Sequence, residues 1–535
     1  MIASPERPHG ATTRRAARTT AIALCASCVL ALTACADLPR EVARTPSSAL
    51  ADGAGTPLAQ VVDASMPAGT QGQSGFRILP TGDFAFDARL ALAARAMKTL
   101  DAQYYQLHSD AVGHRFLRAL RDAAARGVRV RLLIDDFYTT GQDPLFAEFA
   151  AHPNVQLRLF NPLPSRAGSS ARRVMASLHE FGRVNHRMHN KLFVADNSLA
   201  VTGGRNIGDE YFMSGAQANF VDMDVLAAGP IVRELSAAFD RYWNSEHTYP
   251  FESIATPAGD AEAARASFEQ RLRIADGDWK VGPRDMFDRA SVGHELADGK
   301  LSLTPASARL LVDTPDKVKG LATPGNAGTA MFDAVTLMRH ARSEVVMASP
   351  YFIPGERGVE LMRDAVAHGV RMSVLTNAAD ATDEPLVHFA YARYRQQMLQ
   401  AGVSIYELGG SLVAQSRDLG IFHSSQGRLH AKVSVIDRQW VTIGSLNLDQ
   451  RSARANTEST LAIDSATVAQ EVLSLVERSG HVAGSYKLRL DEDGRIEWVS
   501  RQGDADVVTR DEPGATALSR LWLWLLSRFV SDDLL

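Results

Sequence analysis

Histidine, lysine, aspartate and asparagine recur at one fixed spacing in two distant stretches of this chain. In both stretches the lysine lies two residues after the histidine, the aspartate five residues after the lysine, and the asparagine ten residues after the aspartate. The two sets are His189, Lys191, Asp196 and Asn206, and His430, Lys432, Asp437 and Asn447. One His-x-Lys pair is usually a surface pair on an edge strand, whereas two full-length copies indicate a catalytic function.

These side chains suit the cleavage of a phosphodiester. Lysine and asparagine would neutralise the charge of the diester and stabilise the additional charge of its five-coordinate transition state. A neutral histidine can attack phosphorus to give a covalent intermediate, while a second, protonated histidine delivers a proton to the leaving alkoxide. We expect no metal and no other cofactor, because a protonated lysine beside each histidine would repel a cation.

The histidines and lysines are predicted to lie on strands. Short apolar runs at residues 192–195 and 433–436 follow the two pairs, and each run ends at a turn-prone aspartate. Residues two apart on a strand share a face at a distance of roughly 7 Å, so the histidine and lysine of one copy could reach one ligand. Asp196 and Asp437 would face away, and we interpret these members of the catalytic motif as supports of the strand end.

Glycine precedes each asparagine, in the pairs Gly203-Gly204 and Gly444-Ser445. Glycine here would let the backbone approach an anion, and we predict that Asn206, Ser445 and Asn447 bind the substrate.

Two nearby lysines would disfavour a protonated histidine, so the general acid needs a carboxylate partner. Asp222 and Glu458 stand downstream of the two motifs and are the candidates for this orienting role. Each could also be an ordinary acid at the edge of a strand, but their matching placement in the two halves favours the orienting role.

The doubled motif resembles the phospholipase D superfamily. Three further segments resemble its bacterial cardiolipin synthase branch, namely residues 203–212 (GGRNIGDEYF), 349–354 (SPYFIP) and 447–452 (NLDQRS). The resemblance covers residues 76 to 480 and implies two facing domains that share one active site at their interface. It also implies that His189 is the nucleophile and His430 the acid and base, although the sequence itself is symmetric on this point.

The order of helix-like and strand-like patterns also repeats between the two halves. Arg121-Asp122 recurs as Arg363-Asp364, with nearly the same offset as the two histidines. The pattern predicts a duplicated α/β unit in which helices cover both faces of a largely parallel or mixed sheet, an α/β/α sandwich. We place the first domain at 76–252, a connector packed on the outside at 253–320, the second domain at 321–480, and a hairpin with a C-terminal tail at 481–535.

The first 35 residues resemble a bacterial lipoprotein signal, in which a charged start and a short apolar stretch precede Leu-Thr-Ala-Cys. Cys35 would be lipidated, and residues 36–75 would form a flexible tether. The alternative is an uncleaved anchor helix. All three cysteines lie in this leader. We therefore predict a membrane-anchored lipoprotein on the periplasmic side of the cell envelope. The outer membrane is preferred over the inner membrane.

Two further segments could contact lipid. Residues 517–535 carry two tryptophans and flanking arginines, which suits either a membrane interface or a terminal helix that covers the core. Residues 165–173 contain three arginines, which could meet anionic headgroups or form a solvated loop.

The predicted function is transfer of a phosphatidyl group. In the favoured reading, phosphatidylglycerol and a second phospholipid, either phosphatidylglycerol or phosphatidylethanolamine, give cardiolipin through a phosphohistidine. Hydrolysis to phosphatidic acid by a phospholipase D remains open, as does a secreted nuclease. The net charge of −4 gives no general attraction to polyanions, so nucleic acid is not an expected partner. The expected partners are phospholipids and the membrane surface.

Overall fold

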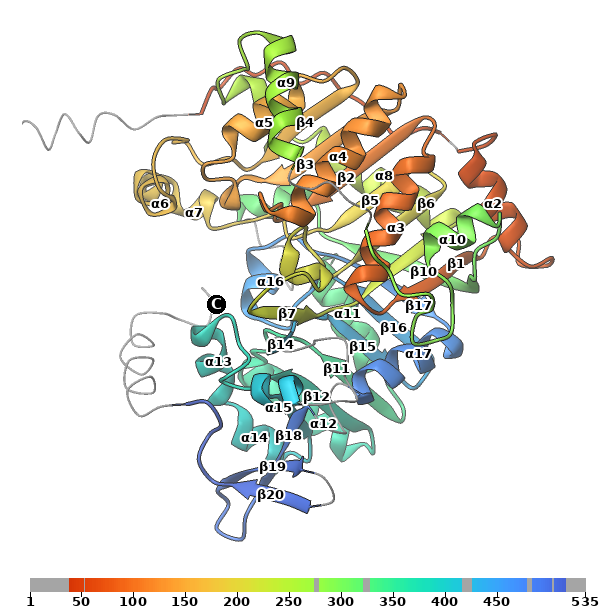
Figure 1. Ribbon diagram of the computed structural model, residues 1–535. Coiled ribbons are helices and arrows are strands. Elements are labelled where there is room, and N and C mark those ends of the chain that lie inside the picture. The colour runs from red at the N-terminus through yellow and green to blue at the C-terminus, as the bar shows by residue number, and fades with distance from the viewer. Residues whose placement is uncertain are drawn as a thin grey trace, which may run out of the picture.

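Two α/β units lie one above the other in the computed structural model (Figure 1). It describes residues 38–51, 53–273, 279–320, 328–415, 426–478, 484–502 and 505–515. The predicted signal with Cys35 and the tail at 517–535 lie outside these residues. Within the described ranges, no helix is both long and apolar enough to span a bilayer.

The sheets of the two units have the same strand order and the same pairing directions. In the first unit the order is β9 (Thr248–Pro250), β4 (Val155–Phe160), β3 (Arg129–Asp135), β2 (Thr99–Tyr104), β5 (Leu192–Ala195), β6 (Leu199–Gly203), β8 (Asp224–Ala228) and β1 (Ser74–Leu79). In the second unit it is β18 (Ser485–Leu490), β13 (Ser404–Leu408), β12 (Arg371–Asn377), β11 (Glu344–Ala348), β15 (Val433–Ile436), β16 (Trp440–Gly444), β17 (Ser459–Asp464) and β10 (Thr304–Val312). The predicted duplicated α/β unit is confirmed.

Strands β1 and β10 join the two sheets edge to edge. They pair antiparallel, with Gly75 opposite Pro305, so 18 of the described strands form one continuous sheet. Because β10 belongs to residues 253–320, the expectation that this whole connector packs on the outside is wrong. Its other described elements include α9 (Ala261–Leu272), α10 (Val292–Ala297) and the 3-10 helix η6 (Pro315–Lys319).

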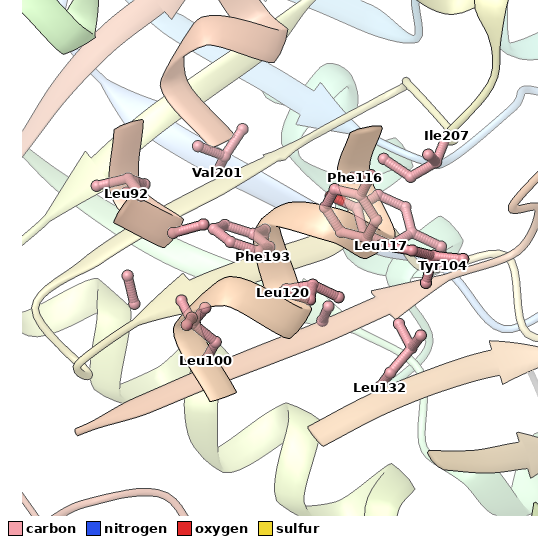
Figure 2. Packing of buried hydrophobic residues seen from close by; sticks show 14 of the residues in the cluster. Leu92, Leu100, Tyr104, Phe116, Leu117, Leu120, Leu132, Phe193, Val201 and Ile207 are labelled. Atoms are coloured by element: carbon pink, nitrogen blue, oxygen red, sulfur yellow. The ribbon is translucent and has the colours of Figure 1, made fainter. Parts of the chain in front are cut away.

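Helices cover the outer face of each sheet. On the first unit these include α3 (Gly82–Arg95), α4 (Ala111–Ala125) and α5 (Asp143–Ala150), and on the second α12 (Gly355–Ala367), α13 (Pro385–Ala392) and α14 (Arg395–Gln400). Asp110 caps the N-terminus of helix α4, where its side chain accepts a hydrogen bond from the Gly113 backbone amide. Figure 2 shows its Phe116 and Leu120 packed over strand residues such as Phe193.

Helices α8 (Pro230–Trp243) and α17 (Ala466–Glu477) pack on the inner faces. Their apolar side chains and those of both sheets form a single buried cluster, in which Leu235 and Val194 belong to the first unit and Val472 and Val435 to the second. One shared core fixes the two units relative to each other, so side chains at their boundary have defined partners. The other described helices of the second unit are α11 (Ala330–Arg339), α15 (Gly410–Gln415) and α16 (Gln450–Arg454).

Residues 38–75 are not a free tether, contrary to the prediction. The Arg44 guanidinium donates to the Thr248 carbonyl at 2.8 Å and lies over the Tyr249 ring. The Ala49 amide donates to Asp240 at 2.8 Å, and helix α2 (Pro57–Ser65) buries Leu58 completely. The composition is linker-like, but these few anchoring side chains are enough to hold the segment on the first unit.

The predicted hairpin near the C-terminus is present. Strands β18 (Ser485–Leu490) and β19 (Ile496–Gln502) pair antiparallel. Strand β18 also pairs with β13, and β20 (Ala505–Thr509) pairs with β19, so the hairpin extends the sheet of the second unit. A second, two-stranded parallel sheet of β7 (Ala218–Val221) and β14 (Gln426–Leu429) bridges the two units beside the motifs.

Candidate active site

One cavity of about 720 Å³ lies between the two units, and both motif histidines line it. Its walls come from both halves of the chain, and they include Tyr105, Tyr138, His189 and Asn206 from the first unit and Tyr351, Asp383, His430 and Asn447 from the second. The structure therefore brings the two histidines and the two asparagines to one site.

The motif histidines and lysines lie in extended segments just before β5 and β15, not on these strands as predicted. The reason is that the histidine backbones bond to the opposite unit. The His189 amide donates to the Thr457 carbonyl at 2.9 Å, and the His430 amide donates to the Val221 carbonyl at 2.8 Å. Each histidine is thus held by the other half of the molecule.

The carboxylate partners are exchanged between the halves in the same way. His189 Nδ1 lies 3.0 Å from Glu458 Oε2 of the second unit. Ser445 and Ser452 donate to the same carboxylate at 2.5 Å and 2.8 Å. Burial would raise the pKa of Glu458, but His189 and Lys191 beside it lower this pKa below its ordinary value. An ionised Glu458 fixes the proton of His189 on Nδ1 and leaves Nε2 for chemistry.

His430 Nδ1 lies 2.6 Å from Asp222 Oδ2 of the first unit. Gly204 makes this approach possible, because a Cβ on that residue would lie 2.0 Å from Asp222 Oδ1. The anion that the Gly204 backbone approaches in this structure is therefore the carboxylate of Asp222.

The motif lysines are buried behind the histidines. Lys191 Nζ donates to the His189 carbonyl at 2.6 Å, and Lys432 Nζ donates to the His430 carbonyl at 2.5 Å. Burial lowers the pKa of Lys432 to about 8 and holds the pKa of Lys191 well below its ordinary value.

Both histidines are neutral at pH 7 in the ligand-free cavity. Burial lowers the pKa of His189 to about 4, against the opposing effect of Glu458. Burial and the neighbouring Lys432 hold the pKa of His430 well below its ordinary value. A neutral imidazole is the form required of a nucleophile.

Asp196 and Asp437 bind backbone amides away from the cavity. Asp196 accepts hydrogen bonds from the amides of residues 97–99 at 2.7–2.9 Å, and Asp437 from those of residues 342–344 at 2.7–3.1 Å. Both residues adopt positive φ at the tight turns of the β5–β6 and β15–β16 hairpins. They fix the ends of the strands that follow the histidines, in keeping with our interpretation of the motif.

The asparagines and Ser445 differ in what they bind. Asn206 accepts a hydrogen bond from the Gln106 amide at 3.2 Å and donates to the Tyr211 hydroxyl at 3.0 Å. The side-chain oxygen of Asn447 is buried without a hydrogen-bond partner, so Asn447 is the motif asparagine with an unsatisfied polar atom at the cavity. Ser445 is bound to Glu458.

Several cavity residues were not singled out from the sequence. The Tyr105 ring packs edge-on against His189, and Tyr211 packs against His430, with centroids 5.1 Å and 5.2 Å away. Tyr351 donates to Asp383 at 2.7 Å, and burial raises the pKa of Asp449 to about 7. Tyr211, Tyr351 and Asp449 lie inside the three family-like segments, so their positions were quoted, but nothing in the sequence separated them from their neighbours.

His108, Asp110 and Glu210 are grouped closely enough to hold a metal, with their ligand atoms within 4.8 Å of one another. Asp110 already caps helix α4, however, and its second oxygen accepts from the Asp209 amide at 2.8 Å. Both oxygens of the Asp110 carboxylate thus already accept hydrogen bonds from the backbone, and we assign no metal to this group.

Comparisons with known proteins agree with this geometry. A family model described as "Cardiolipin synthase, PLD-like domain" matches residues 90–243 and 334–479, one segment in each unit. This fold and site define an enzyme of the phospholipase D superfamily. The chain belongs to the cardiolipin synthase-like family of phospholipase D-type domains.

Among its relatives, cardiolipin synthase C of Escherichia coli is 37% identical over 465 residues, which span 85% of this chain and 95% of the relative. Cardiolipin synthase A of Pseudomonas fluorescens is 27% identical over 404 residues, or 75% of this chain and 67% of the relative. A crystal structure of phosphatidylserine synthase from Haemophilus influenzae has a similar fold, with a TM-score of 0.53 at 12% identity, and covers 86% of this chain and 95% of that one.

Proposed function

We propose that this protein transfers a phosphatidyl group from one phospholipid to the alcohol of another and thereby makes cardiolipin. The observation that carries the proposal is the exchanged pairing of His189 with Glu458 and His430 with Asp222 around one cavity. Two imidazoles that face one site can act as nucleophile and as acid and base on one phosphodiester.

In the first step, Nε2 of His189 attacks phosphorus and forms a P–N bond while the bond to the headgroup oxygen breaks. His430 gives its proton to that oxygen. In the second step, His430 takes the proton of the incoming alcohol, whose oxygen attacks phosphorus and releases His189. One diester replaces another, so no nucleotide is required. Assignment of His189 as the nucleophile follows the family resemblance.

The substrate itself supplies the charge that the resting site lacks. Burial lowers the pKa of both histidines and both lysines in the ligand-free cavity. An anionic phosphodiester placed among them would raise each pKa, because a nearby negative charge favours the protonated forms. Binding of the diester therefore promotes protonation of His430, with Asp222 to orient it, and of the lysines that stabilise the transition state.

Phosphatidylglycerol is the proposed donor, with phosphatidylglycerol or phosphatidylethanolamine as the second lipid. The relatives named cardiolipin synthase C and A support this choice. A phospholipase D that admits water would use the same first step. A nuclease is disfavoured by the cavity wall, where the acidic residues Glu210, Asp383, Glu384 and Asp449 outnumber Arg428 and Arg451.

The proposed location is the periplasmic side of the cell envelope, with Cys35 as the lipidated residue and the outer membrane preferred. The tail at 517–535 is proposed as a second membrane contact. Fractionation of cells after metabolic labelling with a fatty acid tests both points. Label should be lost with Cys35→Ala, and deletion of residues 517–535 should lower vesicle binding.

The function is tested by incubating the purified full chain with labelled phosphatidylglycerol, with and without phosphatidylethanolamine, and separately with single-stranded DNA. Cardiolipin as the main product supports the proposal. Phosphatidic acid alone would indicate hydrolysis, and cut DNA would indicate a nuclease. His189→Ala and His430→Ala should each abolish turnover, and acid-quenched enzyme should carry label on His189. Label on His430 would reverse the two roles.

A further inference from the structure

Short helices beside the cavity bury one arginine, Arg173, and expose three large apolar side chains. They are α6 (Ser170–Ala176), the single 3-10 turn η2 (Leu178–Glu180) and α7 (Phe181–Val184), which project from the side of the first unit in Figure 1. Arg173 is 1% exposed, whereas Met175 is 70%, Leu178 56% and Phe181 46% exposed. Soluble surfaces usually show the opposite distribution, so this segment has the character of a binding surface for an apolar partner.

A buried carboxylate fixes this inverted arrangement. Arg173 donates to Asp136 at 2.7 Å and to the Ser165 carbonyl at 2.9 Å, and Arg166 donates to the other oxygen of Asp136 at 2.6 Å. Turning Met175 inward would require Arg173 to leave and would strand a buried charge, which is costly. The sequence-based idea that Arg166 and Arg173 meet lipid headgroups is therefore wrong, because both are committed to Asp136.

The exposed apolar surface continues into the catalytic cavity. Phe181 is exposed and also lines the cavity, together with Val174 and Val184. Tyr138 is 41% exposed, and its ring contacts Tyr105, whose ring in turn contacts His189. An apolar path thus runs from the outside of the molecule to the proposed nucleophile.

We propose that Met175, Leu178 and Phe181 insert into the surface of a phospholipid leaflet, so that the acyl chains of a bound lipid follow this path while its phosphate reaches the histidines. This inference rests on the proposed function, because a membrane lipid must pass from the leaflet into the cavity. Arg172, exposed on the same helix, adds a positive charge that favours anionic headgroups. The contact is distinct from Cys35 and from residues 517–535.

Amide hydrogen exchange of the full chain tests the contact without requiring turnover. Vesicles of phosphatidylglycerol and phosphatidylethanolamine should slow exchange in residues 174–184 at least about tenfold, while α9, on the outer face of the first unit, exchanges unchanged. Unchanged exchange at 174–184 on vesicle-bound protein would overturn the proposal. So would equal protection at high protein concentration without vesicles, because a second copy of the chain would then be the partner.

Substitution adds a second test. Met175→Asp with Leu178→Asp should slow turnover of vesicle phosphatidylglycerol at least about tenfold and leave turnover of monomeric short-chain phosphatidylglycerol within about twofold. Phe332→Asp, at a phenylalanine 40% exposed on the second unit, is the matched control and should leave both rates unchanged. Equal slowing of vesicle and monomeric substrate would refute the docking role. If wild-type protein turns over neither substrate, the proposed function fails, and the exchange experiment still decides the membrane contact.

Discussion

Glu458 of the second unit accepts a hydrogen bond from Nδ1 of His189 in the first unit, at 3.0 Å. Asp222 makes the reciprocal contact with His430 at 2.6 Å. Neither half of the duplicated chain therefore contains a complete histidine–carboxylate pair. Catalysis by this arrangement requires both units to be present and packed through their shared core.

The first prediction concerns these carboxylates. Glu458→Gln and Asp222→Asn keep the size of each side chain but remove the charge that orients its histidine. We expect the kcat for phosphatidyl transfer to fall at least about 100-fold in each, with little change in circular dichroism or melting temperature. Asp143→Asn, at a partly exposed carboxylate outside the cavity lining, is the control. Near wild-type kcat in Glu458→Gln would show that Glu458 does not orient the nucleophile.

Gly204→Ala should disable the site through Asp222. The new Cβ would lie 2.0 Å from Asp222 Oδ1, so the carboxylate must move away from His430. We expect kcat to fall about as far as in Asp222→Asn. In the double variant Gly204→Ala with Asp222→Asn, kcat should be little lower than in either single variant. Gly259→Ala, where a Cβ meets nothing within 4 Å, should retain full activity. Additive losses in the double variant would contradict this link.

The buried histidine should make folding stability depend on pH. The pKa of His189 falls from 6.5 in the unfolded chain to about 4 in the folded protein, because burial disfavours its charged form. Below pH 6.5 the unfolded chain binds the proton first, so this group lowers stability as the pH falls from 6.5 towards 4.

Between pH 7 and 4.5, wild type should therefore lose roughly 2 kcal/mol more unfolding free energy than His189→Gln. Urea denaturation at the two pH values measures the difference. Equal losses in the two proteins would mean that His189 is not protonated preferentially in the unfolded state.

Asp136 should be important for stability. It is fully buried, binds Arg166 and Arg173, and also accepts from the Leu163 amide at 2.8 Å. Asp136→Asn leaves the buried Arg173 without its counter-charge and Arg166 with Asp143 alone, and should lower the free energy of unfolding by about 3 kcal/mol. Asp143→Asn, which breaks a more exposed pair with Arg166, should cost less than about 1 kcal/mol. A small effect of Asp136→Asn would imply that the α6–α7 segment is not anchored through this carboxylate.

The site could be predicted from the sequence to the extent that its information is local. The histidines, lysines, aspartates and asparagines recur at fixed spacing because each set spans one hairpin and the segments beside it. The role of Asp196 and Asp437 could also be inferred, since a turn-forming residue at an odd spacing faces away from the ligand.

Contacts between distant segments could not be predicted in this way. Which carboxylate bonds to which histidine depends on how the two units face each other. No local pattern in the sequence encodes that arrangement. The connector and the presumed tether show the same limit, since β10 and Arg44 are ordered by partners remote in the chain.

The sequence by itself determined the chemistry of this protein, because residue types and spacing define a phosphodiester site and its duplication. The tertiary structure decided the exchange of carboxylates between the units, the role of Gly204, and the burial of Arg166 and Arg173. The physical reason is that burial and long-range hydrogen bonds arise only when segments far apart in the chain pack together. The short helices at and after the arginine-rich stretch 165–173 therefore expose Met175, Leu178 and Phe181.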